Sequence, residues 1–591
     1  MANIEPVQVV EIDIDYCTRA YGDFYSGGGE CNAILGTTGV RKCFNTFATC
    51  QVTSKFNKET KTIRFITPTA SVPKGQVYFP ALKSVSAFSS SVNIGGTNPR
   101  LGDLGKRGKV TVKLQDFAYH DRYLDKYQSG RVDGSAQTDE GGYNPEDRGS
   151  FFTKLKSRFP FYAGRALRVI DGYVDGGVFT TLQTRHFILT DFVGPSGNGD
   201  ITLEAKDVLT LAEKKSATAP KPSGGQLAAD IATGLLSFDL SPAGIGSTYP
   251  ASGYAVMGSE VVSYTRSTDT ITLTGRAQYN TVESDHKEGD TFQEAIVYSD
   301  VLINDVAEDL LSNYTDIPSG YLPTDDWQTE VQRWAGNLII NAIITEPTSV
   351  AKLLGELAVL GVSIWWDDVA QEIKLKVTKP VDIDATIYEL SDNSNIKKIT
   401  QEDRDEDRLT QIHFYSVQSD PTGSPTDKAN YDRIRVVVDT VAEQGNSYND
   451  TRIREIFCRW LNTGRDTAVR LRSLRLLTRF NTAPKLFKMT LDAKDISIGL
   501  TDVIRVDSRV ITDETGKSVP TLLEVIQRSE PIAGHEVEIV AQSYLYEGKY
   551  GYIMEDTANS YDSATTAEKE DGCYISDAAG VIFTDDPYLI I

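Results

Sequence analysis

Short runs in which apolar and polar residues alternate recur along most of this chain. Examples are the runs at 110–117 and 535–546, and turns rich in Gly and Asn separate many of them. Successive side chains of a β-strand point to opposite faces, so this two-residue period predicts strands with one buried and one solvated face. Helical spacing is confined to a few stretches, namely 305–311, 348–360 and an arginine-rich stretch at 451–480. The pattern therefore predicts a mainly β protein with an α/β unit.

The length and local composition predict several domains. At roughly 100 to 200 residues per domain, 591 residues correspond to about four domains. A polar stretch rich in Pro and Gly at 217–226 predicts a linker. The predicted divisions are a small domain with clustered cysteines at 1–85, a first β-rich domain at 86–216, a β insert at 217–299, an α/β unit at 300–380, a second β-rich domain at 381–550, and an acidic extension at 551–591 that forms no domain of its own.

The charge balance limits the partners of the chain. Acidic residues outnumber basic residues by 82 to 60, which gives a formal net charge of -22. Sequence-independent nucleic-acid binding depends on clustered Lys and Arg that release counterions from the phosphate backbone, so we expect no stable nucleic-acid binding. The first 15 residues are acidic where a signal peptide would be basic, and no stretch of 18 uncharged apolar residues occurs. We therefore expect a chain made in the cytosol without a membrane span.

Four of the six cysteines fall within 34 residues: Cys17, Cys31, Cys43 and Cys50. Thiolates on the loops of a small β-rich domain can converge on one metal centre, and a cytosolic thiol cluster is not expected to persist as disulfides. The spacing lacks the C-x2-C pair that usually closes a structural zinc site. It therefore favours an iron–sulfur cluster, with zinc and unligated thiols as alternatives. Cys458 and Cys573 stand far from any other cysteine.

Several segments resemble proteins of phage tails. The segment 17–56, CTRAYGDFYSGGGEC through KCFNTFATCQVTSKF, resembles the cysteine-bearing domain of tail-tip proteins in long-tailed bacteriophages of the lambda type. The segments 108–127 and 185–212 resemble the tube-like part of phage baseplate hubs and gene-transfer-agent hubs, and 257–290 resembles a β module that many hubs carry. The resemblance covers most of 10–545. It departs from the lambda-type pattern because the cluster domain and the hub are fused in one chain here.

The resemblance implies a function as well as a fold. It implies that Cys17, Cys31, Cys43 and Cys50 hold a [4Fe-4S] cluster, and that 86–216 and 381–550 are tube-like domains. It further implies a homotrimeric hub that closes the distal end of a sixfold tail tube, holds the tape-measure protein and a central tip or fibre protein, and opens for DNA ejection. Such a hub would be assembled in the host cytoplasm and would lie at the virion tail tip.

Signals for an enzyme are weak. His535-Glu536 begins like a zinc-protease motif but lacks the second His, and GPSGNG at 194–199 has the composition of a hairpin turn. We therefore expect no catalytic residues. Two alternative functions are a cytosolic iron–sulfur enzyme and a tail-tip protein that binds a glycan or another receptor.

Eight arginines lie between 452 and 479: Arg452, Arg454, Arg459, Arg465, Arg470, Arg472, Arg475 and Arg479. Pairing within the chain is one interpretation of this basic stretch. The other is a contact between tube-like domains or subunits, in which Arg470 or Arg472 meets carboxylates of a neighbour.

Overall fold

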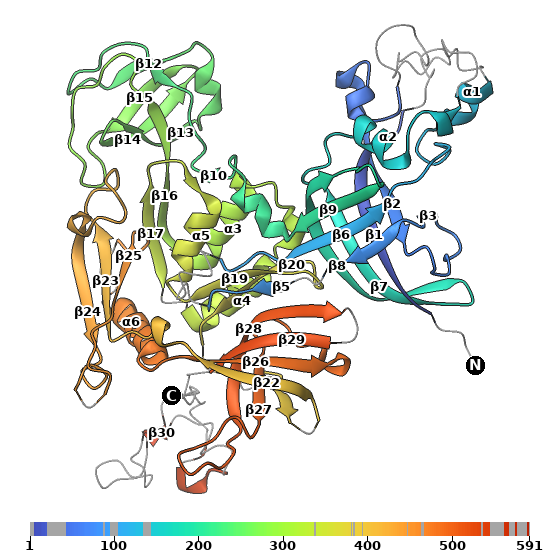
Figure 1. The fold of residues 1–591 in the computed structure, drawn as a ribbon. Coiled ribbons are helices and arrows are strands. Elements are labelled where there is room, and N and C mark those ends of the chain that lie inside the picture. The colour runs from blue at the N-terminus through green and yellow to red at the C-terminus, as the bar shows by residue number, and fades with distance from the viewer. Residues whose placement is uncertain are drawn as a thin grey trace.

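The computed structural model consists of two β bodies, a helical middle region and a β insert that projects from the middle region (Figure 1). The structure describes residues 5–19, 43–86, 89–94, 104–133, 144–335, 338–379, 381, 385–392, 394–445, 447–462, 466–532, 536–543, 559, 561–565, 574–575 and 588–589.

The first β body is a mainly antiparallel sheet that includes the strands on both sides of the clustered cysteines. Its strands are β1 (Glu5–Cys17), β2 (Lys58–Ile66), β3 (Tyr78–Phe79), β4 (Leu82–Val85), β6 (Lys109–Gln115), β7 (Ala166–Asp175), β8 (Val178–Val193) and β9 (Asp200–Lys206), with the helices α1 (Gln128–Asp133) and α2 (Phe151–Arg158) beside them. Strand β1 lies between β2 and β7, with Val10 opposite Phe65 on one side and Val169 on the other. Alternate residues of β1 therefore face a core that contains Phe65 and, from α2, Phe151.

The two strands that flank the cysteine-bearing segment, β1 and β2, thus share one sheet with the strands that follow them. Strand β1 pairs with β7 over Glu5–Ile12, and β7 belongs to the predicted first β-rich domain. The division expected at residue 85 therefore does not coincide with a break in this sheet. Residues 20–42 lie outside the described part of the chain.

The second β body is a sheet of later strands around its own core. Its strands are β21 (Tyr388–Ser391), β22 (Ile396–Asp403), β26 (Lys485–Asp492), β27 (Val503–Asp507), β28 (Thr521–Ile532) and β29 (Glu536–Ser543). Alternation along β26 buries Phe487, Met489 and Leu491 in this core, whereas Lys488 between them is exposed. The period-two pattern of the sequence is thus realised as one apolar and one polar face.

The middle region holds the largest core and most of the helices. Its elements are β10 (Thr218–Ala219), α3 (Ile303–Tyr314), α4 (Thr324–Ala335), β17 (Ile339–Ile344), β18 (Thr348–Ser349), α5 (Val350–Ala358), β19 (Val362–Asp367), β20 (Glu372–Val377), β23 (Gln411–Gln418), β24 (Tyr431–Val438), β25 (Ile453–Cys458) and α6 (Asp466–Phe480). Helix α5 buries Val350, Leu353, Leu354 and Leu357, which recur at helical spacing along one face. Residues of α6 and β23 join the same core.

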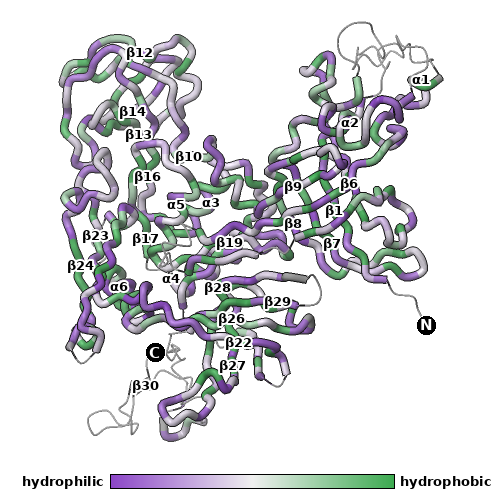
Figure 2. Tube along the Cα trace, viewed as in Figure 1, coloured by the Kyte–Doolittle hydropathy of each residue, from purple (hydrophilic) through white to green (hydrophobic). Residues whose placement is uncertain are grey.

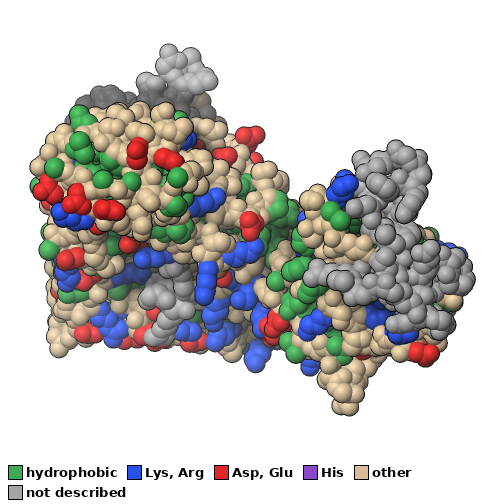
Figure 3. All heavy atoms as spheres, turned by 90° about the horizontal axis from the view of Figure 1, so that it is seen from above, with side chains coloured by type: hydrophobic (Ala, Val, Ile, Leu, Met, Phe, Trp, Pro, Cys, Tyr) green, Lys and Arg blue, Asp and Glu red, His purple; other side chains and the backbone are tan. Residues whose placement is uncertain are grey.

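The β insert forms a seven-stranded sheet that ends on β17. Its strands are β11 (Gln226–Leu227), β12 (Ser237–Ser241), β13 (Ser252–Met257), β14 (Glu260–Ser267), β15 (Thr270–Gly275) and β16 (Phe292–Leu302). Seen from above, the insert and the first β body form two lobes, and Lys and Arg side chains gather between them (Figure 3). Further along the chain, β30 (Tyr574–Ile575) pairs with β31 (Tyr588–Leu589).

The predicted mainly β, multidomain class is confirmed. Hydrophobic and hydrophilic residues alternate along the strands of both β bodies (Figure 2). Helices were expected at 305–311 and 348–360, and α3 and α5 lie there. The expectation of a helix from 451 was wrong for its first part, because the alternating residues of β25 pair with β23 before α6 begins. No helix in the described part of the chain is long and apolar enough to span a membrane.

Candidate functional site

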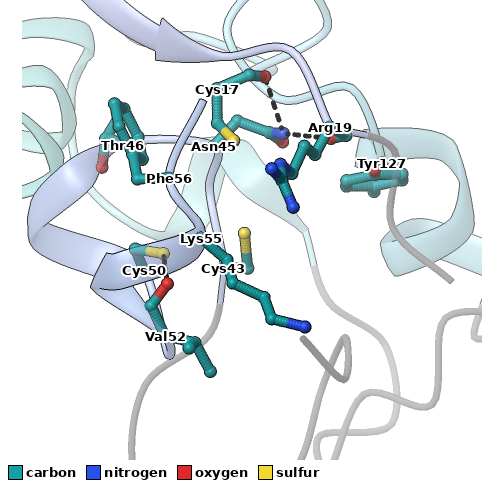
Figure 4. A pocket seen from close by; sticks show the side chains of 10 residues that line it. All are labelled: Cys17, Arg19, Cys43, Asn45, Thr46, Cys50, Val52, Lys55, Phe56 and Tyr127. Carbon is teal, nitrogen blue, oxygen red and sulfur yellow. Dashed lines mark hydrogen bonds between the residues drawn. The ribbon is translucent and has the colours of Figure 1, made fainter. Parts of the chain in front are cut away.

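Three of the four clustered cysteines line one cavity in the first β body. Cys17 ends β1, and Cys43 and Cys50 lie in the segment that leads into β2 (Figure 4). Cys31 lies outside the described residues. The residues that line the cavity are Cys17, Arg19, Cys43, Asn45, Thr46, Cys50, Val52, Lys55, Phe56 and Tyr127.

Asn45 ties the second cysteine segment to the end of β1. Its φ of 60° places it in the left-handed region, which Asn tolerates better than most residues. Its side-chain amide donates hydrogen bonds to the carbonyl oxygens of Cys17 and Arg19, both at 3.3 Å. The backbone N–H of Cys17 in turn donates to the carbonyl oxygen of Asn45 at 2.7 Å. The turn therefore holds the chain near Cys43 against the chain near Cys17.

Basic and aromatic side chains surround the sulfur atoms. Arg19 and Lys55 line the cavity, and the Lys126 ammonium donates to the carbonyl oxygen of Cys17 at 3.3 Å. Thiolates and clusters bound by thiolates carry negative charge, which such cations offset. Phe47 packs edge-on against Phe56 with ring centroids 5.3 Å apart, which gives this side of the cavity an apolar wall.

The donor chemistry fits a thiolate-bound centre, because sulfur ligands suit both iron–sulfur clusters and zinc. Among the described residues, however, no group of three or more His, Cys, Asp or Glu side chains is arranged to hold a metal ion. The described sulfurs therefore do not make a metal site by themselves, and the four-cysteine set with Cys31 stays a prediction. The sequence analysis did not identify Asn45 or Tyr127. The position of Asn45 between two of the cysteines was a usable signal, whereas Tyr127 lies too far along the chain for any local pattern to indicate it.

The isolated Cys458 fits a structural interpretation. It ends β25 and is 2% exposed, and burial raises the pKa of its thiol to about 12. Such a thiol stays protonated near neutral pH and is unreactive. Cys573 lies outside the described residues.

Several members of the arginine-rich stretch pair within the chain. Arg459 binds Glu356 of α5 at 2.8 Å, and Arg479 lies 3.3 Å from Glu524 of β28. The second pair links α6 to the second β body. Arg472 is 8% exposed, and its role as a carboxylate partner of a neighbouring domain or chain stays a prediction.

The first β body, the second β body and the middle region meet at Arg185 of β8. Its side chain is fully buried, and its guanidinium binds Glu530 of β28 at 2.5 Å and Asp171 of β7 at 2.8 Å. Asp368, in the turn between β19 and β20, lies 3.6 Å away, and its carbonyl oxygen accepts a hydrogen bond from the backbone N–H of His186 at 3.0 Å. Burial raises the pKa of Asp368 to about 6, although Arg185 acts against this shift. One buried arginine thus joins three parts of the chain through carboxylates.

A short strand, β5 (Ser89–Ser91), joins the two β bodies into one sheet. Ser89 lies opposite Ser529 of β28 and opposite Lys109 of β6. Residues directly opposite each other in neighbouring strands share a face of the sheet. Continued across the neighbouring strands, this register forms a polar row: Lys398, Thr490, Glu538, Ser529, Ser89, Lys109 and Lys206. All seven residues are exposed or half-buried. The four that belong to the second β body, Lys398, Thr490, Glu538 and Ser529, line a groove of about 540 Å³.

No family model and no curated protein matches the sequence. Among solved structures, the chain is similar to the tail protein from Neisseria meningitidis MC58, at 10% identity and a TM-score of 0.36 over 78% of this chain and 91% of that chain. It is also similar to the 43 kDa tail protein of prophage MuSo2 from Shewanella oneidensis, at 11% identity and a TM-score of 0.34 over 78% and 98%. It is similar as well to the prophage tail protein gp18 from Listeria monocytogenes EGD-e, at 8% identity and a TM-score of 0.32 over 80% of this chain and 93% of that chain. Likeness at these scores assigns no function to this chain.

Proposed function

We propose that this chain is a structural hub at the tip or baseplate of a phage or phage-like tail. The observation that supports this proposal is the polar row that crosses both β bodies through β5. One face of the joined sheet covers two hydrophobic cores, and the other carries the Lys, Thr, Ser and Glu side chains of the row, four of which line a groove on the second β body. A sheet of this kind suits the wall of a water-filled tube, because its polar face can stay solvated while its apolar face packs.

Three copies would place six β bodies around one axis. Such a homotrimer would match a sixfold tail tube above to threefold components below. The buried junction at Arg185 supports the arrangement, because it fixes the spacing of the two β bodies within each copy. The hub would close the distal end of the tube, hold the tape-measure protein and a central tip or fibre protein, and open for DNA ejection. It would be assembled in the host cytoplasm, lie at the virion tail tip and catalyse no reaction.

The charge of the chain is compatible with DNA passage. Three copies carry 3 × (-22) = -66 formal charges. Net negative charge repels the phosphate backbone, so DNA that passes through would not be retained.

We further propose that Cys17, Cys31, Cys43 and Cys50 hold a [4Fe-4S] cluster in a structural role, with zinc as the alternative. Three of these residues line one cavity with Arg19 and Lys55, which supports a shared centre of negative charge. When bound, such a centre supplies cross-links between segments of the chain. Structural zinc sites contribute about 10 to 16 kcal/mol of apparent binding free energy that is coupled to folding, and we expect the same scale here.

Electron microscopy of the purified full chain tests the hub proposal. We expect threefold rings with a central opening, and a population of monomers at all concentrations would overturn the proposal. Iron and acid-labile sulfide analysis of anaerobically purified protein tests the cluster separately. Zinc without sulfide would overturn the [4Fe-4S] assignment while leaving the four-cysteine centre in place.

A further inference from the structure

Strand β24 presents an edge that is unpaired among the described residues. It pairs with β23 from Tyr431, opposite Gln418, to Val438, opposite Gln411. Within the described ranges no strand pairs with its other edge, and β24 lies at the outer margin of the molecule (Figure 1). The outward N–H and C=O groups of an eight-residue strand are a template for pairing with another strand.

One face of the same three-stranded sheet exposes four aliphatic side chains beside the polar residues Gln411, His413 and Glu455. Ile434, Val436 and Val438 of β24 are 51%, 45% and 39% exposed, and Ile453 of β25 is 49% exposed. The register places all four on one face, because Val438 and Ile453 both lie opposite Gln411 and the other two follow at intervals of two residues. The opposite face packs into the main core. Exposed aliphatic side chains gathered beside an open edge mark an interaction surface.

A second unpaired edge lies on the first β body. Strand β8 pairs with β7 from Val178 to Ile188, with a bulge at Leu182, and β9 covers its other edge only from Ile188 onward. Between Val178 and Gln183 no described strand pairs with this edge, and Val178 and Leu182 are 66% and 71% exposed. The β7–β8 hairpin ends on the side of the molecule opposite to β24 (Figure 1).

We propose that the open edge of β24 in one copy takes up the first half of β8 from a second copy as an added strand. This inference rests on the proposed ring and names its contact between copies. The two stretches have similar lengths, both expose branched aliphatic side chains, and they lie on opposite sides of the chain. A contact between two different surfaces is heterologous, so repetition can close a ring, whereas pairing of β24 with itself would stop at a dimer.

Cysteine pairs test this contact in the full chain. Leu182→Cys is combined in turn with Ile434→Cys, Val436→Cys and Val438→Cys, which covers the registers possible on one face. Under mild oxidation we expect at least one pair to give covalent dimers and closed trimers. The control replaces Leu182→Cys by Val282→Cys, because Val282 is a 76% exposed apolar residue of the β insert. The unaltered chain under the same oxidant reports any cross-links of the natural cysteines.

Association measured by analytical ultracentrifugation gives a second readout. We expect Ile434→Lys with Val436→Lys to weaken association at least about tenfold, with Val282→Lys as the control for added charge. If trimers form no cross-link and associate as strongly with Ile434→Lys and Val436→Lys, this contact is overturned but the proposed ring is not. The open edge of β24 would then bind another protein. Monomers at all concentrations would overturn the contact and the ring together.

Discussion

The substitution Glu530→Gln tests whether the buried junction joins the two β bodies. Glu530 is fully buried and contacts both Arg185, at 2.5 Å, and Arg528. The amide keeps the shape of the side chain but removes its negative charge. Among the described residues, Asp171 and Asp368 then remain as carboxylate partners of Arg185.

The expected loss of stability follows from the burial of Glu530 and Arg185. Removal of one partner from a buried ion pair costs about 3 to 5 kcal/mol of unfolding free energy, because the remaining charge stays buried without compensation. We expect the lower end of this range, since two carboxylates still face Arg185. The matched control is Glu389→Gln. Glu389 binds Arg505 at 2.6 Å, but their side chains are 62% and 41% exposed. Glu389→Gln should therefore lower the free energy of unfolding by at most about 1 kcal/mol.

Amide hydrogen exchange is the appropriate assay, because a chain of several domains does not unfold in two states. For Glu530→Gln we expect exchange at β5 and β28 to accelerate about a hundredfold, the factor that corresponds to roughly 3 kcal/mol. For Glu389→Gln we expect little change at those strands. Equal acceleration of exchange in the two variants would refute the reasoning, since it would show that the buried ion pair of Glu530 stabilises these strands no more than an exposed one.

Four further predictions follow from the other features of the chain. Serine at any of the four clustered cysteines should remove the visible absorbance of the cluster and unfold the segment between β1 and β2, while Cys458→Ser and Cys573→Ser should do neither. Absorbance and iron content check this prediction, and an unchanged iron content would contradict it. Because the pKa of Asp368 rises from the ordinary 3.8 to about 6 on folding, the folded state binds this proton more tightly, so its contribution to stability should increase as the pH falls from about 7 to about 4. Asp368→Asn should flatten that part of a plot of unfolding midpoint against pH, and an unchanged curve would contradict the assignment. Deletion of 551–591 should leave trimers intact in ultracentrifugation and impair attachment of tip components, whereas loss of folding would show that the extension belongs to a core. Mobility-shift assays with duplex DNA at physiological salt should show no stable complex, and tight binding would argue against a tube for DNA.

Local pattern was sufficient for much of the fold. The alternating run at 110–117 is realised as β6, which buries Val110, Val112 and Leu114, and the apolar spacing at 348–360 is realised as α5. Cys17, Cys43 and Cys50 line one cavity, whereas the four-cysteine centre with Cys31 stays a prediction. Strand β6 and helix α5 could be predicted because periodicity reports which face of an element is buried, and periodicity is a local property.

The junctions left no local signal. Strand β5 is a run of three serines, a residue type without strand preference, and its pairing depends on β28, more than 400 residues later. Arg185 occupies an ordinary position in an alternating run, and its partner Glu530 is 345 residues away. Whether such a charge is buried depends on packing between elements that are far apart in the sequence. The arginine-rich stretch was misread in part for the same reason, since pairing of β25 with β23 outweighs the helical appearance of residues 453–458.

The two kinds of contact in the proposed ring differ in how readily they can open. Within a copy, the β bodies are joined by backbone pairing through β5 and by an arginine that is fully buried among carboxylates, so separation would expose an unpaired buried charge. Between copies, the proposed contact of β24 with β8 uses solvated strand edges and side chains that are already 39% to 71% exposed in the single chain. Separation there returns groups to water that are accessible in the monomer. If the hub opens to let DNA pass, the movement is therefore expected between copies, with each chain moving as one block, and exchange at β5 should stay slow while exchange at β24 increases.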